Sequence, residues 1–416
     1  MEKLAIEGGK PVNTEPFPPW PSFSEKTFKK TEKRNNVMRI GSITPCRYTP
    51  GTLEYVSFIR GNAGWSHHQG PSLYQYSDGR LIMLWAAYDI DECNNDNVIL
   101  YSISEDSGER WSDPEVFMAA PGANVSHAFQ VQLRGTDKVI MVNRESHFVG
   151  EIHDPVTKRH LKTADYARSA SRIILRKSLD LGSTWNFGNE LLYEQIVPHH
   201  RPPFYGAPEA FLQLQSGELL MAVCFLPPDQ REPQHYHVAF LRSEDEGETW
   251  ERTHILTVPE ERGAMEPTIV ELEPDELYCV LRNKSGYLYE TMSLDGGRSW
   301  SAPEKTSIPS PEAICKLLKL QSGRVILIWN NQSSTTQRPR YPLVVAFSED
   351  GCKSWSKPRV IATESGANQL SNFGVIQLSD GRILLGISHY HATPPTTSDI
   401  DLAIFDEEWI LKGEEG

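Results

Sequence analysis

Ser104-Glu105-Asp106-Ser107-Gly108-Glu109-Arg110-Trp111 is the stretch that decides the fold, because its pattern recurs along the chain. The pattern is Ser-x-Asp-x-Gly-x-x-Trp, and in the last of five copies cysteine replaces the glycine. The aspartates of these copies are Asp106, Asp180, Asp245, Asp295 and Asp350. A motif that returns at intervals of roughly 50 residues or more is typical of repeat architectures. We interpret residues 406–409, Asp-Glu-Glu-Trp, as a degenerate sixth copy.

Each copy follows a short apolar run, such as residues 98–103 or 343–347. Runs of β-branched and aromatic residues that end in a turn predict strands. In the turn, the aspartate can accept hydrogen bonds from backbone N–H groups and the glycine can take a positive φ. The tryptophan then covers the turn with its apolar face. The motif is therefore expected to shape a turn rather than to carry catalysis.

A second repeat, offset from the first, consists of two apolar runs joined by a short polar turn, most often Ser-Gly or Asp-Gly, a strong signal for a β-hairpin. Its six copies span residues 71–85, 130–141, 211–221, 268–278, 317–327 and 375–385. Six hairpins between five or six boxes predict six four-stranded blades. Residues 54–60 are the first convincing strand, and we expect them to close the ring as the outer strand of the last blade, which removes exposed sheet edges.

The repeated box is identified as an Asp box, and over roughly residues 54–410 the chain resembles the sialidase (neuraminidase) superfamily. The resemblance implies an all-β fold, a six-bladed β-propeller of four-stranded antiparallel blades with Asp boxes. We assign residues 53–416 to this single propeller and residues 1–52 to an N-terminal arm and linker. The arm resembles the opening arm of DegT-type sugar aminotransferases, and it could join copies of the chain into a homo-oligomer. No cofactor follows from that short match, because the rest of the chain shows no pyridoxal phosphate pattern.

The composition narrows the classes of partner. The formal net charge of −14 argues against nucleic acid, although local arginine clusters can still bind an anionic substrate. The sequence contains no run of about 18 apolar residues and no apolar signal-peptide core at its start, so we expect neither a membrane partner nor export. The six cysteines show no paired spacing, as expected of reduced thiols in the cytoplasm. A small-molecule or oligosaccharide substrate is the expected partner.

The hairpin turns and the boxes should share one face of the propeller, because both lie at the same end of their blades. The opposite face is then formed by residues just before each first strand and just after each second strand. The candidates on that face are His67, His68, Gln69, Asp89, Asp91, His127, Arg144, Glu209, Glu266, Arg282, Asn330, Arg340, Asn372, His389 and Tyr390. A rim so rich in charged and imidazole groups around a central pit is the expected functional site.

The sialidase resemblance assigns roles to some of these residues. Sialidases hold a substrate carboxylate with three arginines and use a Tyr–Glu pair with an aspartate as acid/base. Arg282 and Arg340 match two of the arginines, and Glu266 precedes Arg282 as the family's glutamate does. The first arginine is absent, since residues 67–71 read His-His-Gln-Gly-Pro, and Asn372 stands where the nucleophilic tyrosine is expected.

Three functions remain open. The first is a glycosidase that holds an acidic sugar on Arg282 and Arg340, with Asp89 or Asp91 as general acid and Glu266 or Glu209 as second carboxylate. The second uses histidine, foremost His68, to cleave a uronate-linked sugar as a lyase or glycosidase, since neutral histidine can move protons near pH 7. The third is a non-catalytic glycan-binding propeller. A metal site is disfavoured, because no tight ligand spacing such as His-Glu-x-x-His occurs.

Overall fold

The computed structural model describes residues 43–414 except 63, 93, 187, 197–201 and 207. The compact unit spans Ile40–Gly416. The aminotransferase-like arm lies outside the described residues, so its role in oligomerisation stays a prediction. In the part of the chain that is described, the fold is all-β with a propeller-like arrangement, and helix is confined to α1 (Tyr193–Ile196), α2 (Glu407–Leu411) and the turn Lys412–Glu414. None of the described helices has the length and apolarity to cross a bilayer.

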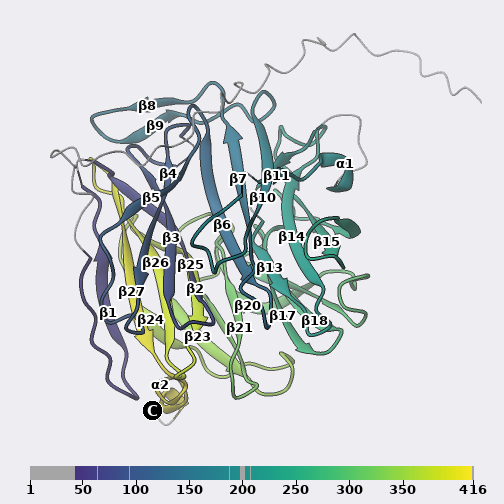
Figure 1. Ribbon diagram of the computed structural model, residues 1–416. Helices are drawn as coiled ribbons and strands as arrows, with labels where there is room; N and C mark the ends of the chain where they lie inside the picture. Colours follow the sequence, from purple (N-terminus) through teal and green to yellow (C-terminus); the bar gives the residue numbers. More distant parts are fainter. Residues whose placement is uncertain are drawn as a thin grey trace, which may run out of the picture. The chain divides into compact units, whose positions relative to one another are not determined.

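The described strands form one eight-stranded, one five-stranded, three four-stranded and one two-stranded sheet (Figure 1). In the eight-stranded sheet the order is β25 (Gln369–Gln377), β26 (Ile383–His391), β27 (Thr397–Phe405), β2 (His67–Gln75), β3 (Leu81–Tyr88), β4 (Val98–Ser104) and β5 (Glu115–Ala119), with β1 (Glu54–Ile59) paired to β27. The next sheet is β6 (Asn124–Gln132), β7 (Val139–His147), β10 (Ala170–Ser178) and β11 (Asn189–Glu190).

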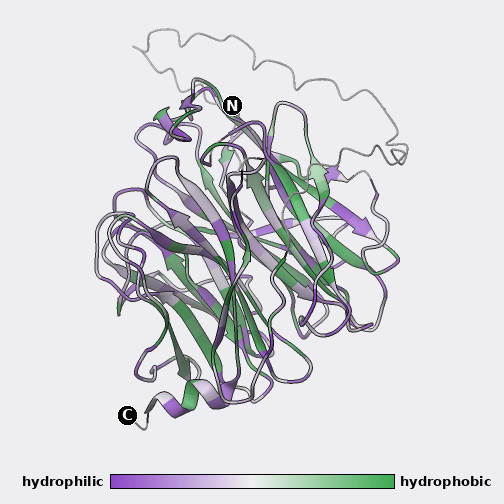
Figure 2. Cartoon of the chain, turned by 90° about the vertical axis from the view of Figure 1, so that its left-hand side faces the viewer, coloured by the Kyte–Doolittle hydropathy of each residue, from purple (hydrophilic) through white to green (hydrophobic). Residues whose placement is uncertain are grey.

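The five-stranded sheet holds β12 (Phe204–Tyr205), β13 (Ala210–Gln213), β14 (Leu219–Leu226), β15 (His237–Ser243) and β16 (Glu251–Leu256). The last two four-stranded sheets are β17 (Met265–Glu273), β18 (Glu276–Arg282), β19 (Tyr287–Ser293) and β20 (Glu304–Pro309), and then β21 (Lys316–Lys319), β22 (Val325–Asn330), β23 (Leu343–Ser348) and β24 (Arg359–Ala362). The two-stranded sheet is the hairpin of β8 (Ile152–Asp154) and β9 (Arg159–Lys162). Apolar residues concentrate along the strands and polar residues in the loops, as Figure 2 shows.

The two ends of the described chain meet in one sheet. β1 runs antiparallel to β27, with Glu54 opposite Ile404, and the purple and yellow strands lie side by side in Figure 1. β27 is therefore covered by a strand from the start of the described chain, as predicted for residues 54–60. Residues that we assigned to the linker also contact this unit, since the Gly51 N–H donates to the Asp406 carboxylate at 2.7 Å.

The five boxes form the same turn. The serine Oγ donates to the aspartate Oδ1 at 2.7–2.9 Å, and a backbone N–H four residues beyond the aspartate donates to the same oxygen at 2.8–2.9 Å. In the fifth box Cys352 takes the left-handed conformation, φ 65°, that glycine adopts in the others. The aspartates are thus turn-forming residues, as the sequence predicts.

The expected sixth box is a different structure. Asp406 is the N-cap of helix α2, and its Oδ1 accepts the Trp409 N–H at 2.7 Å. Glu407 and Glu408 occupy the first turn, where acidic side chains favour a helix. An aspartate followed by two glutamates and a tryptophan therefore caps a helix, because no glycine is present to turn the chain back into a strand.

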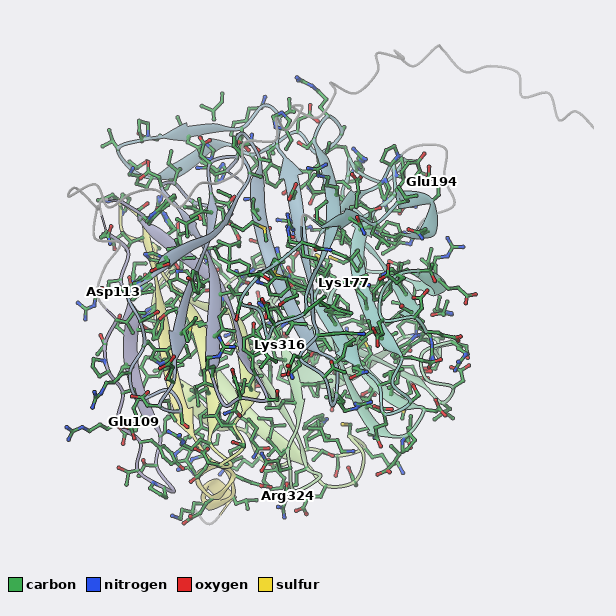
Figure 3. All side chains as sticks on the ribbon, in the orientation of Figure 1. Glu109, Asp113, Lys177, Glu194, Lys316 and Arg324 are labelled. Atoms are coloured by element: carbon green, nitrogen blue, oxygen red, sulfur yellow. The ribbon has the colours of Figure 1, made fainter. Side chains whose placement is uncertain are left out.

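Hairpin turns and boxes lie at one end of the unit. The Arg80 Nη2 in the first hairpin turn donates to the carbonyl of Leu181 in the second box at 3.1 Å, and Lys138 pairs with Glu246 of the third box at 2.6 Å. Figure 3 labels Glu109 of the first box and Arg324 of a hairpin turn at the lower end, whereas β8 and β9 lie at the upper end. The upper end is the face on which the sequence placed the functional site.

Candidate functional site

A cavity of about 500 Å³ lies at the end opposite the boxes. Its walls come from the beginnings of inner strands, the ends of second strands, and loops from several sheets. Among the described residues that line it, five arginines face three carboxylates: Arg144, Arg262, Arg282, Arg338 and Arg340, with Asp91, Glu92 and Glu266. The cavity is thus locally cationic in a chain whose net charge is −14, and such a cleft attracts anions.

Four inner strands share one backbone irregularity at the cavity. Strands β2, β6, β17 and β25 each shift register against the next strand, for example between Met265 and Thr268. At each shift one residue has a positive φ: Gly70 (61°), His127 (57°), Glu266 (42°) and Asn372 (46°). For a residue other than glycine this conformation costs about 1–2 kcal/mol. His127, Glu266 and Asn372 all line the cavity, so the strain serves to aim their side chains into it.

Glu266 is part of an ion-pair network. The Arg282 Nη1 donates to Glu266 Oε2, and the Arg282 Nη2 lies 3.7 Å from the buried Glu312 carboxylate. Glu312 also accepts from Arg262 Nη1. Burial by itself would raise the pKa of Glu266, but the charge and hydrogen bond of Arg282 outweigh it and hold that pKa below its ordinary value. Glu266 is therefore an ionised carboxylate at neutral pH.

Arg340 is a buried cation held by neutral groups. Its Nε donates to the Gln337 carbonyl at 3.0 Å and its Nη2 to the Glu312 carbonyl at 3.2 Å. No carboxylate oxygen of a described residue lies within 4.0 Å of its guanidinium. Burial, followed by the charge of Arg282, lowers the pKa of Arg340 to about 10, so the side chain stays charged at neutral pH. An arginine in this state can bind the carboxylate of a ligand by donating hydrogen bonds to it.

Glu92 has the opposite character from Glu266. It is an exposed residue at the border of the cavity, and desolvation by the nearby protein, followed by the charge of Asp91, raises its pKa. Asp91 accepts the Glu92 N–H at 2.9 Å and, through Oδ2, the Tyr390 hydroxyl at 3.3 Å. The site thus contains one carboxyl group with a raised pKa and one with a lowered pKa, the arrangement that acid/base catalysis requires.

His127 is the predicted histidine that lines the cavity. Its Nδ1 lies 2.9 Å from Ser126 Oγ, and its Nε2 lies 3.5 Å from a Glu209 carboxylate oxygen. Burial lowers the pKa of His127 to about 3, and the neighbouring Arg144 charge acts in the same direction. The imidazole is therefore neutral at physiological pH and can act as a proton acceptor.

The cavity brings together most of the residues that the sequence singled out. Those that line it are Gln69, Asp91, His127, Arg144, Glu266, Arg282, Arg340, Asn372 and Tyr390. The strap of β8 and β9 covers one side and adds His160 to the lining. It is fastened across the sheets, since the Thr396 N–H donates to the Thr157 carbonyl at 3.0 Å and Lys158 pairs with Asp89 at 3.0 Å.

The paired histidines of the first inner strand do not reach the cavity. His68 is fully buried, and its Nδ1 accepts the Trp85 indole N–H at 3.0 Å, so it belongs to the core. His67 is also fully buried, between Ser66 and Thr396, with its ring stacked on Tyr390. Burial lowers the pKa of both to about 4. The expectation that His68 carries the chemistry is corrected by this placement.

Four further candidates lie away from the cavity. Glu209 borders a smaller channel of about 220 Å³ between the inner strands, where it accepts from Lys316 at 2.9 Å; Lys316 is labelled in Figure 3. Asp89 is half exposed and forms an ion pair with Lys158. Asn330 is buried and donates to the Leu370 carbonyl at 3.0 Å.

His389, the fourth of these candidates, lies between two carboxylates, Asp401 at 2.8 Å and Glu364 at 2.7 Å. Burial alone would lower the pKa of His389, but Asp401 and then Glu364 raise it above its ordinary value. His389 therefore forms ion pairs with these two carboxylates and does not line the cavity.

Sequence reasoning missed Glu92, Arg262 and His160. Glu92 follows Asp91 in an acidic loop, and that run of acids was the available signal. Arg262 lies in a connection between sheets, where no strand period fixes the direction of a side chain. His160 lies in β9, a short strand outside the hairpin repeat. In the part of the chain that is described, no group of three His, Cys, Asp or Glu side chains could hold a metal ion.

Comparison with known proteins identifies the relatives of this architecture. A family described as a BNR repeat-like domain matches residues 79–385. A protein named sialidase from Bacteroides fragilis (strain YCH46) is 24% identical over 209 residues, which are 48% of this chain and 36% of that protein, so the match spans about a third of the relative.

Solved structures with the same fold include the NanB sialidase from Streptococcus pneumoniae, with a TM-score of 0.65 and 15% identity over 85% of this chain and 70% of that chain. The Hadza microbial sialidase Hz136 has a TM-score of 0.62 and 18% identity over 82% of this chain and 66% of that chain. A protein of unknown function from Dyadobacter fermentans DSM 18053 has a TM-score of 0.65 and 19% identity over 86% of this chain and 100% of that chain. At such identities the likeness establishes the fold.

Proposed function

The chain belongs to the family of BNR repeat-like domains, and from this premise we propose that it is a carbohydrate-active enzyme, a sialidase-like glycoside hydrolase acting on a carboxylate-bearing sugar. The observation that carries the proposal is the convergence of five arginines and three carboxylates on one cavity. The sialidases among its relatives support the class of reaction. Cytoplasmic location is also proposed, supported by the free, buried state of the five described cysteines.

The arginines provide the binding step. Arg340 presents a Nη1 group that has no hydrogen-bond partner among the described residues, and Arg282 stands beside it with its charge already shared by Glu266 and Glu312. A substrate carboxylate is expected to bind Arg340 first, because Arg340 lacks a competing carboxylate. This places the acidic sugar against Glu266.

The carboxyl groups provide the chemistry. Glu92, whose pKa is raised, is expected to protonate the leaving glycosidic oxygen. Glu266, ionised and aimed into the cavity by its bulge, is expected to stabilise the positive charge that develops on the sugar ring or to activate water. Desolvation and then the charge of Asp91, which accepts the Tyr390 hydroxyl, raise the pKa of Glu92. We thus propose Glu92 as the general acid in place of Asp89 or Asp91, which precede it in the same loop.

We also infer that the propeller has six blades. The eight-stranded sheet divides into two groups, β2–β5 and β25–β27 with β1, and β2 and β27 are paired only at His67 and Ser398. The other four large sheets each supply one blade. This division agrees with the six hairpins in the sequence.

The test is turnover of a panel of uronic and nonulosonic acid glycosides, measured by release of reducing sugar. Wild type is expected to cleave at least one member, and Glu266→Gln to lower kcat by about 10²–10⁴-fold. Glu261→Gln, which removes a carboxylate paired with Lys284 outside the cavity, is the control and should retain activity. Silence of the wild type across the panel would count against a hydrolase, and glycan binding without turnover would favour a non-catalytic propeller.

A second function is favoured by the state of His127. A neutral imidazole held in a strained conformation in the cavity lining, which also includes Asn372 and Gln69, suits removal of the proton next to a uronate carboxylate, and therefore a lyase. A lyase releases an unsaturated sugar that absorbs ultraviolet light, whereas a hydrolase does not. If the unsaturated product forms and His127→Ala abolishes it while Glu92→Gln does not, the lyase function replaces the hydrolase.

A further inference from the structure

We infer that the cavity contains a second anion subsite at Arg144, so that the ligand carries two anionic groups, one bound by Arg340 and the other by Arg144. This inference deepens the proposed function and rests on it, because the first anion is the sugar carboxylate proposed above. It assigns a substrate class, namely acidic sugars with a second carboxylate or a sulfate.

Arg144 and Arg282 occupy equivalent positions in two sheets. Arg144 pairs in register with Ser126, directly before the bulge of β6, and Arg282 pairs with Met265, directly before the bulge of β17. Both arginines line the cavity. The repeated architecture therefore places two guanidinium groups, one from each sheet, at equivalent positions in the cavity. The residue at each bulge determines which group its guanidinium contacts.

The two bulges differ in charge. In β17 the bulge residue is Glu266, which forms an ion pair with Arg282. In β6 the bulge residue is His127, which burial keeps neutral with a pKa of about 3. Arg144 consequently has no carboxylate oxygen of a described residue within 4.0 Å. A half-buried cation without a counter-charge is unfavourable alone, and a ligand anion removes that penalty.

The surroundings of Arg144 fix its orientation without neutralising it. Its Nε donates to Ser126 Oγ and its Nη1 to the Gly206 carbonyl, both at 3.2 Å. Its Nη2 has no hydrogen-bond partner in the described part of the chain. Glu209 acts on Arg144 at longer range, but its carboxylate already accepts from Lys316 at 2.9 Å. The guanidinium is thus held in place with one edge available.

Arg340, which lies just before β23, resembles Arg144: its two acceptors are neutral carbonyls, its Nη1 has no hydrogen-bond partner, and no carboxylate of a described residue lies within 4.0 Å. Two oriented, uncompensated arginines in one cavity of about 500 Å³ match a ligand with two separated anionic groups. A ligand with one carboxylate leaves one of them unpaired. Two linked uronates, or a uronate linked to a sulfated sugar, supply an anionic group for each arginine.

The primary experiment maps anions directly by crystallography of protein soaked in selenate, whose selenium is located by anomalous scattering. Wild type should show selenate at both Arg144 and Arg340, Arg144→Gln only at Arg340, and Arg340→Gln only at Arg144. Arg168→Gln, an exposed arginine outside the cavity, is the control and should keep both. Selenate at Arg340 alone in the wild type overturns the second subsite and leaves the proposed function standing, whereas selenate at neither arginine contradicts both.

The source of the second anion is then determined by calorimetric titration with galacturonate, digalacturonate and a sulfated uronate disaccharide. The disaccharide with the matching second anion should bind about tenfold more tightly than galacturonate, the contribution of one charge-assisted contact. Arg144→Gln should remove that difference, while Arg340→Gln weakens all three sugars. An advantage that survives Arg144→Gln would place the second anion elsewhere and refute the assignment.

Discussion

At the scale of single residues, the pKa values of the two glutamates at the cavity are shifted in opposite directions because their neighbours differ. Glu266 touches Arg282, and this lowers its pKa despite burial. Glu92 has Asp91 as its neighbour, and desolvation with that negative charge raises its pKa. The same residue type therefore provides one carboxyl group with a lowered pKa and one with a raised pKa in one site.

This difference predicts a bell-shaped dependence of kcat/KM on pH. Activity requires ionised Glu266, so it falls as the pH drops through the lowered pKa of Glu266, below the ordinary glutamate range. It also requires protonated Glu92, so it falls as the pH rises through the raised pKa of Glu92, above that range. Glu92→Gln should lower kcat and abolish the alkaline limb. An alkaline limb that persists unchanged in this variant would exclude Glu92 as the acid.

Some of these residues could be predicted from the sequence and others could not, for a physical reason. Positions next to the inner and second strands, such as Glu266, Arg282 and His127, follow from the hairpin repeat. The repeat cannot say which of two neighbours faces the cavity, because alternate side chains of a strand point to opposite sides. His67 and His68 show this limit, since one stacks under Tyr390 and the other binds Trp85. Glu92 lies in a loop, where no period applies.

At the scale of elements, each box is a turn that depends on its serine. Ser243 Oγ donates to Asp245 and accepts the buried Gly247 N–H, both at 2.8 Å. Ser243→Ala leaves that N–H without a partner, so we expect a loss of about 1–3 kcal/mol in the free energy of unfolding. Chemical denaturation measures it. Ser183→Ala, at an exposed box position, should change little, and equal losses in both variants would contradict the assigned role.

The β8–β9 strap is the second element with a testable role. Lys158 holds Asp89 at 3.0 Å and Arg159 donates to the Ala392 carbonyl, so both fasten the strap over the cavity. Replacing both with alanine should raise KM about two- to tenfold with a smaller change in kcat, because positioning is lost rather than chemistry. Steady-state kinetics measure the change in KM and kcat, and amide hydrogen exchange over residues 152–162 measures the loosening of the strap. Lys162→Ala, at an exposed site on the strap, should behave as wild type.

At the scale of the whole molecule, the ring is completed where strands β25 and β2 meet. A Cβ added at Gly374 would lie 2.3 Å from the Pro71 carbonyl oxygen, so the two backbones are closer than any side chain allows. Gly374→Ala should therefore destabilise the unit by about 1–3 kcal/mol or more. The control is Gly381→Ala, where an added methyl meets nothing within 4 Å and the left-handed φ of 91° costs about 1–2 kcal/mol. A melting temperature of Gly374→Ala equal to that of the wild type would show that this contact does not limit the packing of β25 against β2.

The sequence anticipates much of this architecture because every repeat contains its own turn chemistry. Boxes and hairpins locate the strands, and the early strand at residues 54–59 pairs with β27 as expected. The strap and helix α2 break the repeat, so periodicity could not reveal them. Asp406 illustrates the difficulty, since a box aspartate and a helix N-cap both accept backbone N–H groups and differ only in the residues that follow.

The four bulges provide equivalent backbone positions at which different side chains can be presented. Gly70, His127, Glu266 and Asn372 share one backbone shape, so the scaffold accepts a proton acceptor, an acid, an amide or no side chain without rearrangement. Gly70 has no side chain, and a Cβ built there has no heavy atom within 4 Å. Reaction chemistry can therefore diverge among descendants of such a chain by single substitutions while the architecture persists. The same property makes these positions the natural entry points for engineering a new activity into the fold.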